Sequence, residues 1–131
     1  MWDAHTLKYR IRIERNSEIV NAAPDSAIAI VLTTIGADAD AASLARTLVE
    51  ERLAACVNIL PPMTSFYRWK DAIEEAREQQ LVMKTTPDQV AALGTRLREL
   101  HPYELPEFIV LDATASVAYA AWVRESIAPD A

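Results

Sequence analysis

The sequence is poor in glycine, cysteine and long apolar runs, and each shortage excludes a class of protein. The two glycines, Gly36 and Gly94, stand too far apart for a P-loop or a dinucleotide-binding loop, which need glycines at short fixed spacings. The one cysteine, Cys56, excludes an internal disulfide and fits a reducing compartment. No apolar run approaches the roughly 20 residues of a membrane-spanning helix, and the N-terminus lacks a signal-peptide pattern. We therefore expect a cytoplasmic protein without membrane contact.

An excess of basic charge is also missing. The formal net charge is −6 at pH 7, from 13 Lys and Arg residues against 19 Asp and Glu residues. Binding to nucleic acid needs a basic face that displaces counterions from phosphates, so we expect no nucleic-acid partner. Hydrophobic residues make up 51% of the 131 residues, a balance typical of one folded domain with a real core.

The first 24 residues differ in character from the rest and predict an N-terminal extension to a domain over residues 25–131. Residues 9–15 alternate polar and apolar side chains, as a half-exposed strand does, and residues 21–26 have the composition of a linker. We interpret the segment as a loosely attached extension or an added edge strand. The alternative is that the segment, which is locally basic, forms a small patch that binds an acidic partner.

Deletion of residues 1–24 is expected to leave the thermal unfolding transition in place. The reason is that the segment precedes all the predicted core strands and helices and is joined to them by a proline-containing linker. Scanning calorimetry of the truncated and full-length chains measures this. Loss of the transition on truncation would instead identify the extension as an integral strand.

Apolar runs after residue 26 predict strands, and most of them are short. Continuous apolar stretches with turn residues at their ends are typical of strands buried on both faces. Residues 71–86 are ambiguous, because their first ten residues favour a helix and the remainder favours a strand. The predicted strands are residues 27–34, 54–60, 65–70 and 108–111.

Three segments repeat apolar residues at helical spacing, and a capping residue precedes each. Asp38 or Asp40 is predicted to cap the first helix and Ser116 the last. Thr86 is predicted to cap the second, with Gln89 closing a capping box. The apolar stripe of the last helix, which includes a Tyr119–Trp122 pair, is expected to lie in the core.

The order of elements is β-α-β-(β)-α-β-α. This order predicts an α+β fold of the ferredoxin-like (split β-α-β) type with an extra C-terminal helix. In that arrangement two helices cover one face of a four-stranded antiparallel sheet. The other face would be bare, and a bare apolar face invites a partner or oligomerisation.

Three stretches of the chain stand in series: residues 54–59 followed by 65–69, Glu78 followed by residues 81–85, and the proline-bounded loop 101–107. Together they resemble the CutA divalent-cation tolerance family, and the loop is the most specific of the three. They lie within residues 27–127, about three quarters of the chain. Two positions depart from the pattern, because Asp71 stands where the family usually has a turn glycine and Ala115 where a glycine precedes the last helix. Aspartate adopts a left-handed turn conformation better than most residues.

The resemblance implies a homotrimer of PII-like architecture in which residues 73–86 form a long strand that pairs with a neighbouring subunit. It further implies a role in divalent-cation tolerance and the response to metal ions. The chain would bind copper or a similar divalent cation weakly, would use no organic cofactor and would not be an enzyme. The alternative is a trimeric regulatory or scaffold protein whose inter-subunit cleft binds a small anion or a partner.

His101 and Cys56 are the candidate metal ligands. Imidazole is the commonest metal ligand, and two prolines hold the His101 loop, although a histidine at this place can equally bind the last helix carbonyls. Cys56 is either a small core side chain or a soft ligand for Cu(I). Any copper binding is expected to depend on His101 more than on Cys56, whose apolar strand suggests burial. A catalytic Cys56–His101 pair is a distant third interpretation.

Charged and aromatic residues within the motif stretches form the second candidate site. They either make surface salt bridges, which contribute little, or line a cleft between subunits. Aromatic rings beside a few convergent charges suit a pocket for a small ligand. The candidates are Tyr67, Trp69, Glu78, Lys84, Tyr103, Glu104 and Glu107.

Overall fold

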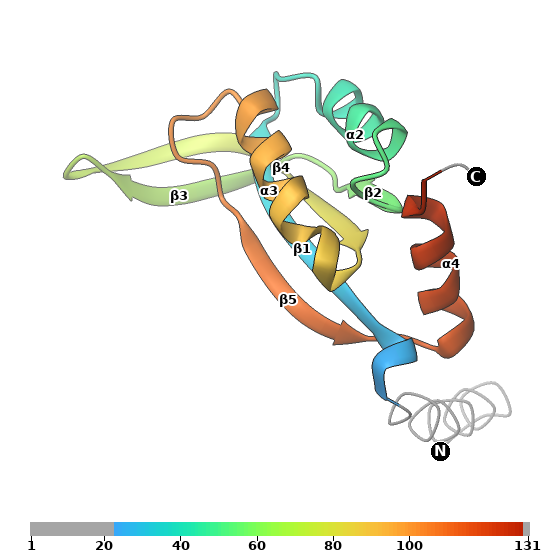
Figure 1. Cartoon of the computed structure of the whole chain (residues 1–131). Helices are drawn as coiled ribbons and strands as arrows, with labels where there is room; N and C mark the ends of the chain where they lie inside the picture. Colours follow the sequence, from blue (N-terminus) through green and yellow to red (C-terminus); the bar gives the residue numbers. More distant parts are fainter. Residues whose placement is uncertain (1–22, 130–131) are drawn as a thin grey trace, which may run out of the picture.

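The computed structural model describes residues 23–129, which form a five-stranded antiparallel sheet with three α-helices (Figure 1). The predicted extension, apart from its last two residues, lies outside the described residues. No helix in the described part is long and apolar enough to cross a membrane. The elements are η1 (Ala23–Ser26), β1 (Ala27–Gly36), α2 (Ala41–Glu50), β2 (Cys56–Ile59), β3 (Met63–Trp69), β4 (Ala72–Thr85), η2 (Pro87–Gln89), α3 (Val90–Leu100), β5 (Ile109–Thr114) and α4 (Val117–Ile127).

The sheet has the strand order β2-β4-β1-β5, and β3 pairs with the part of β4 that extends past β2. The expected four-stranded sheet has five strands, because the predicted strands 54–60 and 65–70 pair with β4 as the separate strands β2 and β3. Pro61 and Pro62, which cannot donate to a ladder, lie between them. The ambiguous segment is the 14-residue strand β4. Ladder bonds along its length outweigh helix propensities of under about 1 kcal/mol per residue. Figure 1 shows the β3–β4 hairpin projecting to the left of the sheet.

The turn at the tip of this hairpin requires left-handed backbone. Lys70 and Asp71 have φ angles of 48° and 65°. Two consecutive residues with positive φ match a type I′ turn, whose twist suits a tight hairpin. Asp71 is the position where the family pattern has glycine, and the structure confirms that aspartate takes up the conformation there.

The helices α2 and α3 cover one face of the sheet and enclose the main core. Strand residues at alternate positions of β1 and β4 meet leucines from both helices. The cap predicted for α2 is confirmed at Asp40, whose Oδ1 accepts a hydrogen bond from the Ser43 N–H at 3.0 Å. The core side chains include Val31, Ile35, Leu44, Leu48, Leu81, Met83, Leu93 and Leu97.

The capping box predicted at Thr86 is absent. Thr86 makes no cap hydrogen bond with its side chain, and its buried Oγ1 has no partner among the described residues. The following residues form the 3₁₀ turn η2 before α3 begins. Gln89 Nε2 instead donates to the Arg52 carbonyl at 3.0 Å, so this side chain ties the turn to the end of α2.

The opposite face of the sheet is covered only at one end, by α4. The strand register places apolar side chains of β1, β4 and β5 in rows on the uncovered remainder, because residues paired across a ladder point to the same side. Ile109 and Leu111 are 43% and 46% exposed. We call this surface the open-face patch: Ile30, Leu32, Val82, Ile109 and Leu111.

Two burial predictions are wrong at this face. Residues 108–111 were expected to form a buried strand, but β5 is an edge strand whose side chains are largely exposed. The Tyr119–Trp122 pair was expected in the core, but both rings are exposed, and α4 buries Ala120 and Val123 instead. Val123 and Ile127 of the predicted stripe do pack in the core with Ala120, so only the aromatic half of the stripe was misassigned.

Candidate functional site

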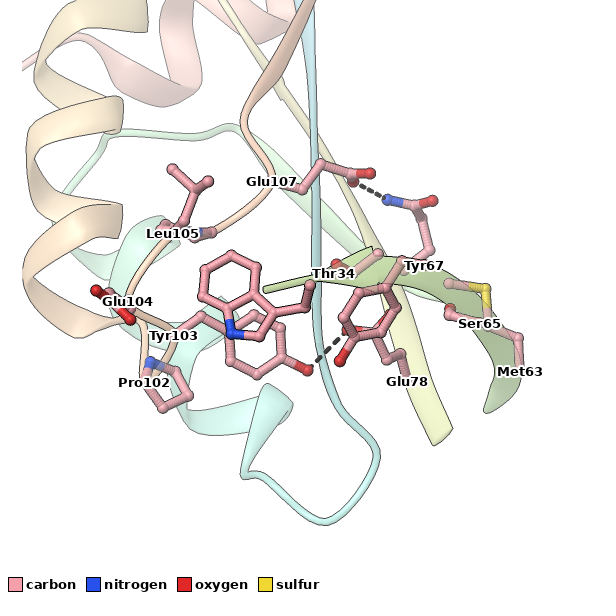
Figure 2. A pocket seen from close by; sticks show the side chains of 13 residues that line it. Thr34, Met63, Ser65, Tyr67, Glu78, Pro102, Tyr103, Glu104, Leu105 and Glu107 are labelled. Atoms are coloured by element: carbon pink, nitrogen blue, oxygen red, sulfur yellow. Dashed lines mark hydrogen bonds between the residues drawn. The ribbon is translucent and has the colours of Figure 1, made fainter. Parts of the chain in front are cut away.

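A cavity of about 920 Å³ lies where the β3–β4 hairpin leaves the sheet (Figure 2). Alternate residues of β3 face it, as do the side chains at positions 78 and 80 of β4, on the same face of the sheet as the open-face patch. The loop that follows α3 closes the other side. We call it the hairpin cavity; it is lined by Thr34, Met63, Ser65, Tyr67, Trp69, Glu78, Gln80 and residues 102–107.

The structure brings together six of the seven cleft residues that the sequence suggested: Tyr67, Trp69, Glu78, Tyr103, Glu104 and Glu107. Lys84 does not line the cavity. It lies further along β4, with its Nζ 5.8 Å from the centroid of the Tyr119 ring.

Gln80 and Ser65 also line the cavity, although they were not among the predicted site residues. The signal that could have found them is the two-residue period of a strand. That period places Ser65 on the same face as Tyr67 and places Gln80 on the same face as Glu78.

A hydrogen bond between Tyr103 and Glu78 joins the loop to β4. The Tyr103 hydroxyl donates to Glu78 Oε2 at 2.7 Å, and Glu78 is only 5% exposed. Burial, followed by the hydrogen bond to Glu78, raises the pKa of Tyr103 well above its usual value. The phenol therefore stays protonated. Figure 2 shows Tyr67 beside this pair, and Tyr67 also contributes to the raised pKa.

Gln80 holds a second carboxylate in place. Its Nε2 donates to the Thr33 carbonyl at 2.8 Å and to Glu107 Oε2 at 2.7 Å. Both partners are acceptors, so the amide orientation is fixed by its own hydrogen bonds. Glu107 is thereby positioned at the wall of the hairpin cavity without a cationic partner in this contact.

His101 is buried behind the cavity loop, with 6% of its surface exposed. Its Nε2 lies 2.7 Å from the Thr34 carbonyl, and its Nδ1 lies 3.1 Å from the Tyr103 backbone nitrogen. The carbonyl can only accept and the N–H can only donate, so Nε2 carries the proton and Nδ1 accepts. Both ring nitrogens are thus used within the protein. In this arrangement His101 has no free lone pair for a metal, and its role is to fix the loop that carries Tyr103.

Cys56 is half-buried on β2, more accessible than its apolar strand suggested. Its Sγ lies 3.8 Å from Asn58 Oδ1. The register places Cys56 in the row of Ile30, whereas His101 binds Thr34, four residues further along β1. Four residues of extended strand span about 13 Å, so a single subunit does not bring the two predicted metal ligands together.

Acidic and metal-ligating side chains do not converge elsewhere in the part of the chain that the structure describes. Within residues 23–129 no group of three or more His, Cys, Asp or Glu side chains is placed to hold a metal ion. The carboxylates of the hairpin cavity come from β4 and from the loop, and two of them are engaged by Tyr103 and Gln80. The carboxylates of the hairpin cavity are thus held apart by separate partners and form no preformed metal centre among the described residues.

The chain resembles proteins of one family in both sequence and structure. Residues 29–126 match the family model described as CutA1 divalent ion tolerance protein. The divalent-cation tolerance protein CutA of Thermus thermophilus is 44% identical over 98 residues, which cover 74% of this chain and 95% of that protein.

Solved structures agree. CutA from Synechococcus elongatus PCC7942 has a TM-score of 0.73 at 44% identity, covering 79% of this chain and 92% of that one. The PII-like protein CutA from Nostoc sp. PCC 7120 in apo form has a TM-score of 0.71 at 36% identity, covering 76% of this chain and 97% of that one. The resemblance carried by the three sequence stretches is confirmed, and the chain belongs to the CutA1 divalent ion tolerance protein family.

Proposed function

We propose that the chain is a non-catalytic binding protein that works as a homotrimer and holds a small ligand in the hairpin cavity. The observation that carries this proposal is the convergence of three aromatic side chains and three carboxylates on one cavity of about 920 Å³. Cavities of this size, with a largely apolar wall and a few placed polar groups, are typical of small-molecule sites. The strand order β2-β4-β1-β5 supports a ferredoxin-like classification of the domain.

The trimer is supported by the open-face patch. Ile109 and Leu111 are more than two-fifths exposed, and the exposed rings of Tyr119 and Trp122 continue the apolar character on α4. Contiguous apolar surface of this kind marks an interaction site. The Nostoc relative is described as PII-like, which agrees with the trimeric architecture that the family resemblance implies. Because the hairpin cavity opens on the same face, a neighbouring subunit on the patch would border it and make it an inter-subunit cleft.

Native mass spectrometry of the purified protein tests the proposal. We expect about three times the 14.6 kDa chain mass, with a small molecule retained on the trimer. A Tyr67→Ala variant should keep the trimer and lose the retained molecule, because Tyr67 lines the cavity. A Phe66→Ala variant is the matched control, since Phe66 is 68% exposed on the other face of the same strand. Equal retention by the wild type and Tyr67→Ala would contradict binding in the hairpin cavity.

A second candidate function is weak binding of copper or a similar divalent cation, as part of a response to metal ions. The observation that favours it is the partly accessible Cys56 thiol in a member of a divalent-cation tolerance family. Thiolate is a soft ligand that suits Cu(I). His101 would need to release the Tyr103 N–H before Nδ1 could bind a metal, so Cys56 is the more available of the two.

A further inference from the structure

The charged residues that line the hairpin cavity are all acidic. Glu78, Glu104 and Glu107 line it, and no Lys, Arg or His is among its lining residues. Asp38 adds further negative charge nearby, because it helps to raise the pKa of Tyr103. A small anion would meet repulsion here, and no basic group of the wall would offset it. The lining therefore selects for a positively charged ligand.

A bare divalent ion does not fit this wall. Hard cations such as Mg²⁺ and Ca²⁺ need about six oxygen ligands close around them. Among the described residues no group of three or more acidic, His or Cys side chains converges in that way. Glu78 and Glu107 are instead bound separately by Tyr103 and Gln80. Their charges are spread around a chamber, which suits a cation larger than a metal ion.

The hairpin cavity also has aromatic rings that a large organic cation can contact. Tyr67, Trp69 and Tyr103 line the cavity, and the faces of such rings attract cations with little hydration cost. The Trp69 ring already makes a cation–π contact within the chain, because Lys70 Nζ lies 5.7 Å from the ring centroid. Lys70 is not part of the cavity lining. Trp69 and Tyr67 are 36% and 43% exposed, so a ligand can reach both rings.

We propose that the hairpin cavity binds an organic ammonium cation. The cation lies against Tyr67 and Trp69, and the carboxylates of Glu78 and Glu107 balance its charge. Cation–π contact with aromatic side chains is the general mode by which proteins recognise quaternary ammonium groups. This inference rests on the proposed function, namely that the cavity is a ligand site, and it names the class of ligand.

Titration of the full-length protein with three probes tests this class. The probes are choline chloride, its uncharged carbon isostere 3,3-dimethyl-1-butanol, and inorganic phosphate. The reporter is the Trp69 indole N–H resonance, which is assigned by its absence from a Trp69→Phe variant among the three tryptophans of the chain. We expect choline to shift this resonance saturably, and the isostere to bind at least about tenfold more weakly because it has the same shape without the charge.

Two pairs of variants separate the cavity from the rest of the hairpin. Tyr67→Leu and Glu107→Gln should each weaken choline binding about tenfold, because one removes a ring face and the other a carboxylate. Phe66→Leu and Glu75→Gln should leave the affinity unchanged, because these residues face the other side of the hairpin. All four side chains are at least partly exposed in the single subunit, so each variant should fold, and native mass spectrometry checks that each keeps the trimer mass.

The outcomes are distinguishable. Equal affinity for choline and its isostere, or choline binding that both cavity variants leave unchanged, would overturn the cation proposal. A phosphate-induced shift of the Trp69 resonance without any choline response would overturn it while keeping the cavity as a ligand site. If no probe binds and no small molecule is retained in native mass spectrometry, both this inference and the proposed function fail.

Discussion

Replacement of Leu32 by glutamate is expected to convert the proposed trimer into a folded monomer. Leu32 lies at the centre of the open-face patch, in one row with Val82 on β4 and Ile109 on β5. A carboxylate buried there between subunits would lose its hydration without gaining a partner, and such a penalty amounts to several kcal/mol per charge. In the monomer the same side chain reaches solvent, because the patch is open in the isolated subunit.

Light scattering measures the outcome as a threefold fall in mass, from about three times 14.6 kDa to one. Circular dichroism should show that the helices and the sheet remain. Val49→Glu is the matched control, because Val49 is 41% exposed on α2 and lies away from the patch. A Leu32→Glu protein that still has the trimer mass would show that subunits do not assemble through this face.

Local chemistry was enough to predict most of the elements. Asp40 and Ser116 cap α2 and α4 by accepting hydrogen bonds from backbone N–H groups three residues further along the chain. A few residues of sequence are therefore enough to predict these caps. α3 ends at Leu100, as the proline at position 102 required. Thr86 has the same local signature as a cap, yet its hydroxyl makes no cap bond, because the Gln89 backbone N–H donates to the Thr86 carbonyl in the 3₁₀ turn η2 instead.

Features decided by distant contacts could not be predicted in this way. The first half of β4 favours a helix by composition, and only its pairing with β3 makes it a strand. The prediction of a strand here came from the family resemblance and not from the local pattern. The exposure of β5 and of the α4 aromatics was likewise misjudged, because an apolar run has the same pattern whether it faces a core or a neighbouring subunit.

The candidate site was only partly predictable from the sequence. Motif residues from two distant segments, 67–78 and 103–107, do meet in one cavity, and the resemblance had grouped them correctly. Lys84 was grouped with them because it belongs to the same motif, but the strand carries it several residues past the cavity. The partners of His101 are backbone groups, a carbonyl and an N–H, and no pattern of side chains can reveal such partners in advance.

Replacement of His101 by alanine is therefore expected to cost stability rather than copper binding. The substitution leaves the Tyr103 N–H without its acceptor and removes the imidazole donor from the Thr34 carbonyl, at a site where only 6% of the histidine surface is exposed. An unsatisfied buried group costs about 1–3 kcal/mol, so the free energy of unfolding should fall by about 2–3 kcal/mol. Urea denaturation at fixed protein concentration measures this. Glu104→Ala, an exposed residue of the same loop, should change it by less than about 0.5 kcal/mol.

Copper titration of Cys56 and His101 variants separates the two roles that the sequence left open. The sequence alone favoured His101 over Cys56 as the ligand. We expect the reverse order, because both ring nitrogens are engaged while the thiol is half-exposed. We expect Cys56→Ser to weaken Cu(I) binding at least tenfold, and His101→Asn to bind as the wild type does. The asparagine variant guards against unfolding, since its side-chain oxygen can still accept from the Tyr103 N–H. A stable His101→Asn protein that loses copper while Cys56→Ser keeps it would restore the imidazole as the metal ligand.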